Sequence, residues 1–264
     1  MTFWRLGVVG SPISHSLSPQ LHRAGLEYLG WEGSSERLDV DEEHAQQIRE
    51  VMSGQFHALS VTMPLKAIAA TMCDDLEETA AHLGVVNSLL WREGRLQGAS
   101  TDGAGFVDSL RGESRAPILD QHVVILGAGG AARAIVHSLV RAGAGEVSVL
   151  GRNRHSVAAL VASNGEVVRP TLAPRPVDLI VNTTPAPSRD EQPLLDGVNR
   201  GTMAVDITYE PRESPWLARH REGGCATMNG LPMLAHTVAR QMNWWWNSDI
   251  PGSYLLSRLS EVLS

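Results

Sequence analysis

One short stretch limits the fold of this chain more than any other, the residues Gly127-Ala-Gly-Gly-Ala-Ala132. They match the pattern G-x-G-x-x-G/A, they follow an apolar run at His122–Leu126 that predicts a strand, and they open a helical pattern ending near Ala142. In this context the turn lets backbone amides and the helix N-terminus face a pyrophosphate. The stretch therefore predicts a dinucleotide-binding unit, with a Gly-rich turn that holds no ligand as the alternative.

The end of the next expected strand, Glu146–Leu150, bears on which nicotinamide cofactor such a unit prefers. An NAD site has Asp or Glu about twenty residues after the turn, where the carboxylate accepts hydrogen bonds from the ribose hydroxyls. This chain reads Leu150-Gly-Arg-Asn-Arg154 there, without a carboxylate. Because a guanidinium pairs with a 2′-phosphate through parallel donors, we expect NADP; solvated loop arginines are the alternative.

Short β-rich runs alternate with helical patterns in the first hundred residues. Strand runs at Phe3–Val9, Arg37–Val40 and His57–Val61 are separated by helical patterns at Pro19–Leu29 and Glu42–Met52. This alternation is typical of βα units and predicts a mainly parallel sheet. Two further runs flank a short turn and predict a hairpin, Val85–Trp91 and Arg95–Gly98.

The second half of the chain has the same α/β character. A helix is expected from Gly103 to about Leu110, and the polar stretch Arg111–Pro117 is read as the passage to a second domain. There the expected elements are at least half of a doubly wound sheet, with later strands at Val177–Val181 and Met203–Ile207 and a Pro-rich loop at Pro170–Pro176. Apolar residues near the end recur at helical spacing and predict one amphipathic helix: Leu231, Leu234, Val238, Met242 and Trp245.

Composition narrows the class of protein and its partners. With 264 residues, 43% hydrophobic and 19% charged, the chain is long enough for two modest domains with cores. Its formal charge of −7 argues against general binding to nucleic acid or to an anionic membrane, since both rely on a basic surface. No run approaches the roughly 18 apolar residues of a membrane span, and the apolar start is too short for a signal peptide. We expect a soluble protein.

Neither the cysteines nor the histidines predict a metal site. Cys73 and Cys225 lie far apart, with no Cys-x-x-Cys motif and no Cys–His cluster at ligand spacing, so neither a disulfide framework nor a structural zinc is indicated. We read His15 and His22 as packing and helix-surface residues. Such cysteine usage suits the reducing cytoplasm.

Two serine hydroxyls mark the segment Gly10–His22, which reads GSPISHSLSPQLH where a strand gives way to a helix. In extended chain the spacing of Ser16 and Ser18 aims both hydroxyls to one side. Such a pair can donate to a carboxylate or exchange hydrogen bonds with a polyol. The alternative is structural, with Ser18 as the N-cap of a helix that has Pro19 at its first position.

Two further segments complete a pattern, Ser60-Val-Thr-Met-Pro-Leu-Lys66 and Ser100-Thr-Asp-Gly103. Together with the serine segment and the Gly-rich turn, they make the chain resemble the shikimate dehydrogenase family nearly end to end. This family reversibly reduces 3-dehydroshikimate to shikimate with a nicotinamide cofactor. The resemblance implies a discontinuous substrate-binding and catalytic α/β domain, residues 1–102 plus 237–264, because the last long helix crosses back to it. It also implies a Rossmann-type NADP-binding domain at residues 103–236.

Oxidation of a secondary alcohol needs a group that takes the hydroxyl proton as hydride leaves, and no metal cluster is visible in the sequence. The resemblance makes Lys66 the general acid/base and Asp102 its neighbour. Read from the residues alone, Lys66 is a surface charge and Asp102 the N-cap of a helix from Gly103.

The resemblance implies further site residues. Thr62 and Asn87 match the family's hydroxyl- and carboxylate-binding positions, with a turn or strand-end role as the alternative. Tyr209 matches a tyrosine at the family's cleft, and a half-buried core tyrosine is the alternative. With Ser16, Ser18, Lys66, Asp102 and Thr237, these residues make the expected substrate site. The expected cofactor site consists of Gly127, Ala128, Gly129, Gly130, Ala131, Arg152, Asn153, Arg154, Ile207 and Gly230.

Three positions depart from the family pattern. Ser60 and Ser100 stand where many members have Asn, which shortens a polar side chain at both places. Thr237 stands where the pattern G-L-x-M-L-x-x-Q places a substrate-contacting Gln. A shorter side chain does not span the same gap without water, so Thr237 bears on which ring acid is the substrate.

The reaction expected from these residues is the NADPH-dependent reduction of 3-dehydroshikimate and its reverse. A paralogue that acts on quinate or on an amino analogue of shikimate is the nearest alternative. A non-catalytic metabolite-binding module is another, against which the retention of both Lys66 and Asp102 speaks. A dehydrogenase of the methylenetetrahydrofolate type would not need Ser16 and Ser18. The expected partner is a carboxylated polyhydroxy ring, and the resemblance leaves a homodimer open.

Overall fold

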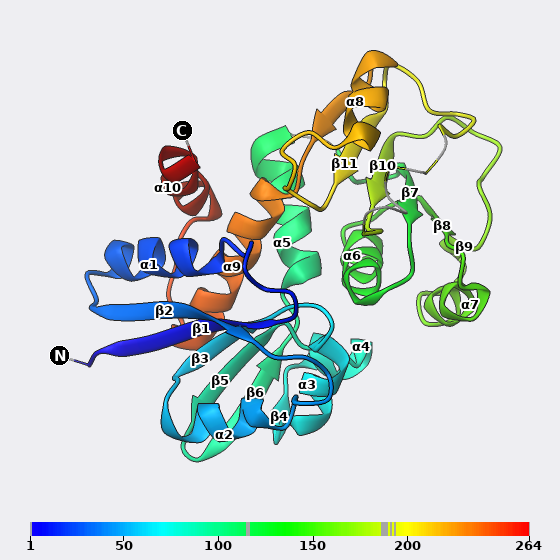
Figure 1. Cartoon of the computed structure of the whole chain (residues 1–264). Helices are drawn as coiled ribbons and strands as arrows, with labels where there is room; N and C mark the ends of the chain where they lie inside the picture. The colour runs from blue at the N-terminus through cyan, green and yellow to red at the C-terminus, as the bar shows by residue number, and fades with distance from the viewer. Residues whose placement is uncertain (1, 115–116, 186–189, 191, 193, 264) are drawn as a thin grey trace. The chain divides into compact units, whose positions relative to one another are not determined.

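The computed structural model describes residues 2–114, 117–185, 190, 192 and 194–263 (Figure 1). The chain forms two compact units, which we call unit 1 (Met1–Gly105 with Leu234–Ser264) and unit 2 (Phe106–Met233). It passes from unit 1 to unit 2 inside helix α5 (Asp102–Ser109) and returns inside helix α9 (Leu231–Trp246). The change of unit therefore precedes the polar stretch at 111–117, of which residues 115 and 116 lie outside the described residues.

Unit 1 is built on a mixed sheet with the strand order β2-β1-β3-β5-β6-β4. Strand β1 pairs in parallel with β2 and β3, and the β5–β6 pair is the expected antiparallel hairpin. The strands span Trp4–Gly10 (β1), Gly33–Asp39 (β2), Ala58–Val61 (β3), Asp75–Leu76 (β4), Ser88–Arg92 (β5) and Arg95–Ala99 (β6).

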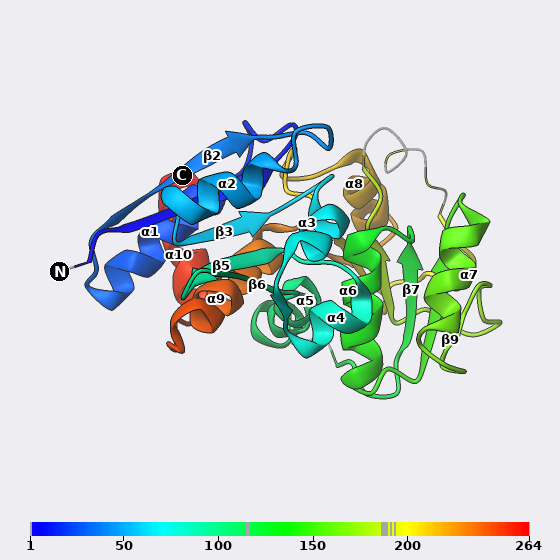
Figure 2. The same cartoon turned by 90° about the horizontal axis from the view of Figure 1, so that it is seen from below.

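Helices cover both faces of this sheet (Figures 1 and 2). On one face, α2, α3 and α4 enclose a core centred on Ile48, Leu59 and Leu89. On the other, α1 packs on β2 and on α10, and Met242 of α9 lies against Gly25 of α1. The helices other than α5 and α9 span Ser18–Leu29 (α1), Gln47–Gly54 (α2), Lys66–Met72 (α3), Glu78–Leu83 (α4) and Gly252–Leu263 (α10).

One helix boundary expected in this unit is wrong. The helical pattern at Glu42–Met52 predicted a single helix, but α2 begins only at Gln47. The carboxylate of Asp41 accepts from the backbone N–H of His44 at 3.0 Å, and this side chain-to-backbone bond holds the preceding residues in turns.

Unit 2 has a parallel sheet with the strand order β12-β11-β10-β7-β8-β9, which confirms the doubly wound α/β class. Alternate residues of its central strands face two cores. Val123 and Ile125 face α6 and α7, whereas Val124 and Leu126 face α8. The strands span His122–Leu126 (β7), Glu146–Leu150 (β8), Val168–Arg169 (β9), Leu179–Asn182 (β10), Met203–Asp206 (β11) and Ala226–Met228 (β12). The helices span Gly130–Arg141 (α6), Arg154–Ala162 (α7) and Pro215–Glu222 (α8), and Leu110–Ser114 form a π-helical turn.

Candidate active site

The segments with the expected chemistry meet at one edge of the unit 1 sheet. Strands β1 and β3 are parallel neighbours, with Val9 opposite Val61, so their carboxyl ends lie side by side. The loops that follow them are joined by a hydrogen bond of 3.1 Å from the backbone N–H of Ser11 to the carbonyl of Met63. The serine segment and the segment leading to Lys66 therefore leave the sheet at the same edge.

Asn87 and Asp102 reach that edge by a different route. Strand β5 runs antiparallel to β3, and β6 runs antiparallel to β5. The amino end of β5 and the carboxyl end of β6 consequently lie beside the carboxyl end of β3. Asn87 directly precedes β5, and Asp102 follows β6 as the first residue of α5.

Lys66 and Asp102 form a close ion pair. The ammonium Nζ of Lys66, the first residue of α3, donates to Oδ2 of Asp102 at 2.6 Å. Their side chains are only 19% and 10% exposed, so Lys66 is not a free surface charge. A charge-assisted bond of this length restricts where the ammonium group points.

The second oxygen of Asp102 is held by Asn87. The amide Nδ2 of Asn87 donates to Oδ1 of Asp102 at 2.8 Å and to Oγ1 of Thr101 at 3.0 Å. Its Oδ1 accepts from the backbone N–H of Thr101 at 2.7 Å. Asn87 thus fixes the orientation of the carboxylate that contacts Lys66.

The serine pair is compact and buried. The hydroxyls of Ser16 and Ser18 lie 3.4 Å apart, and the backbone N–H of Ser18 donates to Oγ of Ser16 at 3.3 Å. Helix α1 begins at Ser18 with Leu17 as its N-cap and no side-chain cap, so the reading of Ser18 as the N-cap is wrong. Arg37 of β2 donates from Nε and Nη2 to the carbonyl of Ser16, at 2.8 and 2.5 Å, and anchors this turn.

Thr237 is a predicted substrate residue whose hydroxyl makes no hydrogen bond among the described residues. It lies on α9 and is 6% exposed, and its Oγ1 is buried without a hydrogen-bond partner in the described part of the chain. A Cβ added at Gly105 would clash with this oxygen, so α5 approaches the Thr237 side chain closely. The hydroxyl is therefore confined and reaches no acceptor among the described residues.

The other two predicted substrate residues fall in different units. Thr62 is half-buried directly after β3, and its backbone N–H donates to the carbonyl of Val9 at 2.9 Å. Tyr209 is half-buried after β11 in unit 2. The geometry of unit 1 thus brings together Lys66, Asp102 and Asn87, while Tyr209 lies outside that unit.

Residues that the sequence reasoning did not single out complete the site. Gln241, one helical turn after Thr237 on α9, donates from Nε2 to the backbone carbonyl of Asn87 at 2.7 Å and accepts from Ser60 at 2.6 Å. Thr101 contacts both ends of the Asn87 amide. The i, i+4 spacing from Thr237 to Gln241 was the available signal, because residues four apart share a helix face.

In unit 2 the Gly-rich turn sits where the strand order reverses, between β7 and β10. Gly127 has φ +111°, and a Cβ there would clash with Oγ1 of Thr183, so only glycine fits. Gly129 is the N-cap of α6 without a side-chain cap, and a Cβ added there would meet open space. The first amides of α6 thus have no capping side chain, which suits a phosphate.

The remaining expected cofactor residues follow neighbouring strands at the same edge. Arg152, Asn153 and Arg154 are exposed after β8, and Oδ1 of Asn153 caps α7 by accepting from the backbone N–H of Ser156. Ile207 follows β11, and Gly230 packs against its carbonyl so tightly that no Cβ fits. Ala128, Gly130 and Ala131 are partly accessible within the turn. Two exposed arginines after β8 and the uncapped N-terminus of α6 after β7, the neighbouring strand, fit NADP.

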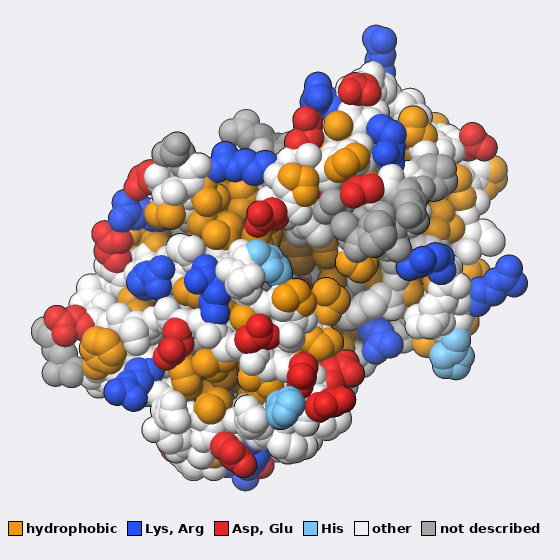
Figure 3. Space-filling model, in the orientation of Figure 1, with side chains coloured by type: hydrophobic (Ala, Val, Ile, Leu, Met, Phe, Trp, Pro, Cys, Tyr) orange, Lys and Arg blue, Asp and Glu red, His pale blue; other side chains and the backbone are white. Residues whose placement is uncertain are grey.

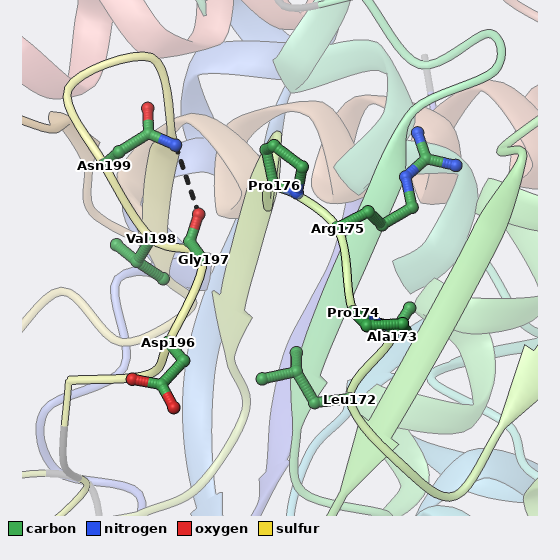
Figure 4. A pocket seen from close by; sticks show the side chains of 9 residues that line it. All are labelled: Leu172, Ala173, Pro174, Arg175, Pro176, Asp196, Gly197, Val198 and Asn199. Carbon is green, nitrogen blue, oxygen red and sulfur yellow. Dashed lines mark hydrogen bonds between the residues drawn. The ribbon is translucent and has the colours of Figure 1, made fainter.

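A pocket of about 550 Å³ opens at the opposite edge of this sheet, between the loops preceding β10 and β11 (Figure 4). It is lined by residues 172–176 and 196–199, remote from the Gly-rich turn.

On the face drawn in Figure 3, acidic and basic side chains are interspersed. In the described ranges, no group of three or more His, Cys, Asp or Glu residues forms a metal site, and no helix has the length and apolar character of a membrane span.

Known sequences match this chain over most of its length. Residues 8–89 match the model of the shikimate dehydrogenase substrate binding domain. Shikimate dehydrogenase (NADP(+)) of Bacillus cytotoxicus is 32% identical over 252 residues, which cover 90% of this chain and 91% of that protein. The protein of the same name from Exiguobacterium sp. is 36% identical over 249 residues, or 91% of this chain and 92% of that one.

The fold gives the same result. A crystal structure of shikimate 5-dehydrogenase from Thermus thermophilus in complex with NADP(H) and shikimate has a TM-score of 0.88 and 33% sequence identity. The match covers 98% of this chain and 99% of that one. The chain therefore belongs to the shikimate dehydrogenase family of NADP-dependent oxidoreductases.

Proposed function

We propose that the protein reduces 3-dehydroshikimate to shikimate with NADPH, and catalyses the reverse reaction, at the edge of the unit 1 sheet. The observation that carries this proposal is the contact between Lys66 Nζ and Asp102 Oδ2 at 2.6 Å, with Asn87 on the other carboxylate oxygen. The named relatives and the complex from Thermus thermophilus support the choice of substrate.

Lys66 is assigned the proton transfer. When bound, the nicotinamide supplies or accepts the hydride. In the reduction, Lys66 Nζ gives its proton to the oxygen that develops negative charge, and in the oxidation it takes the hydroxyl proton back. Asp102 holds the ammonium group of Lys66 in a fixed orientation before the reaction. Less entropy is then lost when the lysine and the substrate reach the geometry for proton transfer.

Ser16 and Ser18 are assigned to the substrate carboxylate. Two hydroxyls 3.4 Å apart can both donate to one carboxylate group, and the backbone anchor from Arg37 keeps their turn in place. Their segment and the Lys66 segment leave neighbouring parallel strands, so one ring acid can contact both. Thr62, Asn87 and Asp102 then face the ring hydroxyls in this proposal.

The cofactor is assigned to the carboxyl edge of the unit 2 sheet. The amides after Gly127 and at the start of α6 would hold the pyrophosphate, and Arg152 with Arg154 would hold the 2′-phosphate. Ile207 and Gly230 are assigned to the same edge, where they follow or approach β11; Tyr209, which also follows β11, keeps its assignment to the substrate.

A second candidate is a paralogue that prefers quinate or an amino analogue of shikimate. The hydroxyl of Thr237, unpartnered within the described residues, favours it, because the family pattern has a longer Gln at this position. The experiment is a spectrophotometric panel in which shikimate, quinate and an amino analogue are each assayed with NADP and with NAD. The highest kcat/KM for shikimate with NADP supports the first candidate. Turnover of another ring acid alone supports the second, and no turnover of any of them contradicts both.

A further inference from the structure

A continuous chain of hydrogen bonds runs through the interior of unit 1 to the carboxylate of Asp102. It joins side chains from β2, α1, β3 and α9 to the backbone carbonyl of Asn87, whose side-chain amide contacts Asp102, and every member is buried. In order, its members are Ser35, His22, Ser60, Gln241, Asn87 and Asp102. Buried polar chains of this kind are stable only when each donor meets an acceptor.

The direction of the chain is set at Gln241. Its side-chain amide lies 2.7 Å from the backbone carbonyl oxygen of Asn87, which can only accept. Gln241 must therefore turn its NH₂ group toward Asn87 and its Oε1 toward Ser60. The Ser60 hydroxyl, 2.6 Å from that oxygen, donates its single proton to Gln241.

The same reasoning fixes the tautomer of His22. Because the Ser60 proton is committed to Gln241, Oγ of Ser60 accepts from His22 Nε2–H at 3.0 Å. Nδ1 of His22 is then unprotonated and accepts from the hydroxyl of Ser35 at 2.8 Å. Burial, with a smaller contribution from the charge of Arg23, lowers the pKa of His22 to about 3, so the ring is neutral at pH 7.

At its other end the chain fixes Asn87 in the site. The backbone of Asn87 donates to the carbonyl of Ala99 at 3.0 Å and accepts from Gln241, while its amide contacts Thr101 and Asp102. The same carbonyl also accepts from the backbone N–H of Val61 at 2.8 Å, so β3 and α9 both hold it, and Gln241 provides the contact from α9. A shift of Asn87 moves the amide that orients the Asp102 carboxylate.

We propose that Gln241 is a positioning residue for the reaction: through the carbonyl of Asn87 it holds the Asn87 amide against Asp102, and thereby Asp102 against Lys66. Ser60 and His22 hold the Gln241 amide in its one productive orientation. The proposal rests on the assignment of Lys66 and Asp102 to the proton transfer. The proposal also gives a role to Ser60, which departs from the family pattern. Its hydroxyl accepts one hydrogen bond from His22 and donates one to Gln241.

The variant Gln241→Met tests the proposal, because it keeps the length of the side chain and removes both hydrogen bonds. We expect kcat for the ring acid to fall about tenfold, the effect of losing one buried orienting bond, with the NADP KM unchanged. Ser60→Ala should have a similar effect and Ser60→Thr should restore most of kcat. In the double variant Gln241→Met/Ser60→Ala the losses should be less than multiplicative, since both break the same chain.

Met242→Ala is the matched control. Met242 is equally buried on α9 and packs against Gly25 without a side-chain hydrogen bond, so the control should lower Tm and leave kcat unchanged. If Met242→Ala does not fold, Met242→Leu takes its place. Normal kcat in Gln241→Met, with only Tm lowered, would overturn the proposal. In that case Lys66→Ala still tests the assigned reaction separately.

A second readout does not depend on turnover. Proton–nitrogen correlation NMR of the imidazoles in the full chain should show His22 as the Nε2–H tautomer, and Gln241→Met should abolish this preference, because Ser60 is then free to donate to His22. An Nδ1–H tautomer in the unmodified protein would reverse the chain and overturn the proposal.

Discussion

Unit 1 and unit 2 prepare their sites in different ways. In unit 1 the functional side chains are buried and bonded to one another, as Lys66 is to Asp102 and Asp102 to Asn87. In unit 2 the expected cofactor contacts are backbone amides of the Gly-rich turn and the exposed arginines Arg152 and Arg154. Proton transfer requires a fixed geometry, whereas a phosphate group can be held by charges that adjust to it. The difference predicts that breaking the Lys66–Asp102 pair in unit 1 acts on kcat, whereas removing an arginine of unit 2 acts on the KM for the cofactor.

The largest expected effect is a loss of kcat when the ion pair of unit 1 is broken. Lys66→Ala should lower kcat by about 10²- to 10⁴-fold and change the KM for the ring acid little, because in the proposed reaction the lysine moves a proton and is not the main binding group. Asp102→Ala should also lower kcat, and the double variant should lose less than the product of the two effects. Steady-state kinetics at saturating cofactor measure this. A near-normal kcat for Lys66→Ala would place the acid/base elsewhere.

In unit 2 we expect the opposite result, a change in the KM for the cofactor with little change in kcat. Arg152→Ala should raise the KM for NADP about tenfold to a hundredfold and leave the KM for NAD and kcat nearly unchanged, because under the proposed assignment only the 2′-phosphate loses a charged partner. Arg141→Ala, at the far end of α6, is the control and should change neither value. Initial rates with both cofactors provide the test. Equal catalytic efficiency with NADP and NAD in the unmodified protein would contradict the assignment.

A buried histidine in unit 1, His22, predicts that stability depends on pH. In unit 2, burial also lowers the pKa of His220, so both units contribute in the same direction. The pKa of His22 is about 3 in the folded protein, whereas an exposed histidine has about 6.5. The unfolded chain therefore binds more protons below pH 6.5, and stability falls as the pH drops from 6.5 toward 3. This group alone should cost about 2 kcal/mol of unfolding free energy between pH 7 and pH 5. Urea unfolding followed by tryptophan fluorescence should show the loss in the unmodified protein. A variant His22→Gln with the same pH slope would exclude His22 as its cause.

The two units also differ in how far the sequence alone describes them. The strand, turn and helix expected to hold the cofactor in unit 2 could be predicted because they are contiguous: the strand His122–Leu126, the turn at Gly127 and the helix that follows are neighbours in the chain. Parallel strands then bring Arg152 and Ile207 to the same edge by a general rule. Local spacing was sufficient for each of these inferences.

The unit 1 site depends on long-range contacts. Residues alone left Lys66 a surface charge, and only the family resemblance placed it beside Asp102. Gln241 was missed because its partners Ser60 and Asn87 are 181 and 154 residues away in the chain. The i, i+4 spacing from Thr237 places Gln241 on the same face of α9, but it does not identify these partners, which are met only when α9 packs against β3 and the residue before β5. His22, read from its position as a packing or helix-surface residue, is fully buried and hydrogen-bonded at both ring nitrogens.

The smallest expected effect concerns Thr237, where the hydrogen bonding of unit 1 is incomplete. Its hydroxyl is buried without a partner in the described part of the chain. Because the Thr side chain is shorter than the Gln of the family pattern, we expect it to reach no ring hydroxyl directly. Thr237→Gln should lower the KM for shikimate by up to about tenfold, the value of one neutral hydrogen bond. Thr237→Val is the control: it keeps the shape, removes an unsatisfied hydroxyl, and should leave KM unchanged while Tm stays constant or rises by about 2–4 °C. Assays of both variants on shikimate and quinate decide the matter. If Thr237→Gln abolishes shikimate turnover while the unmodified enzyme prefers another ring acid, Thr237 determines the substrate specificity. The protein is then the paralogue that acts on quinate or on an amino analogue of shikimate.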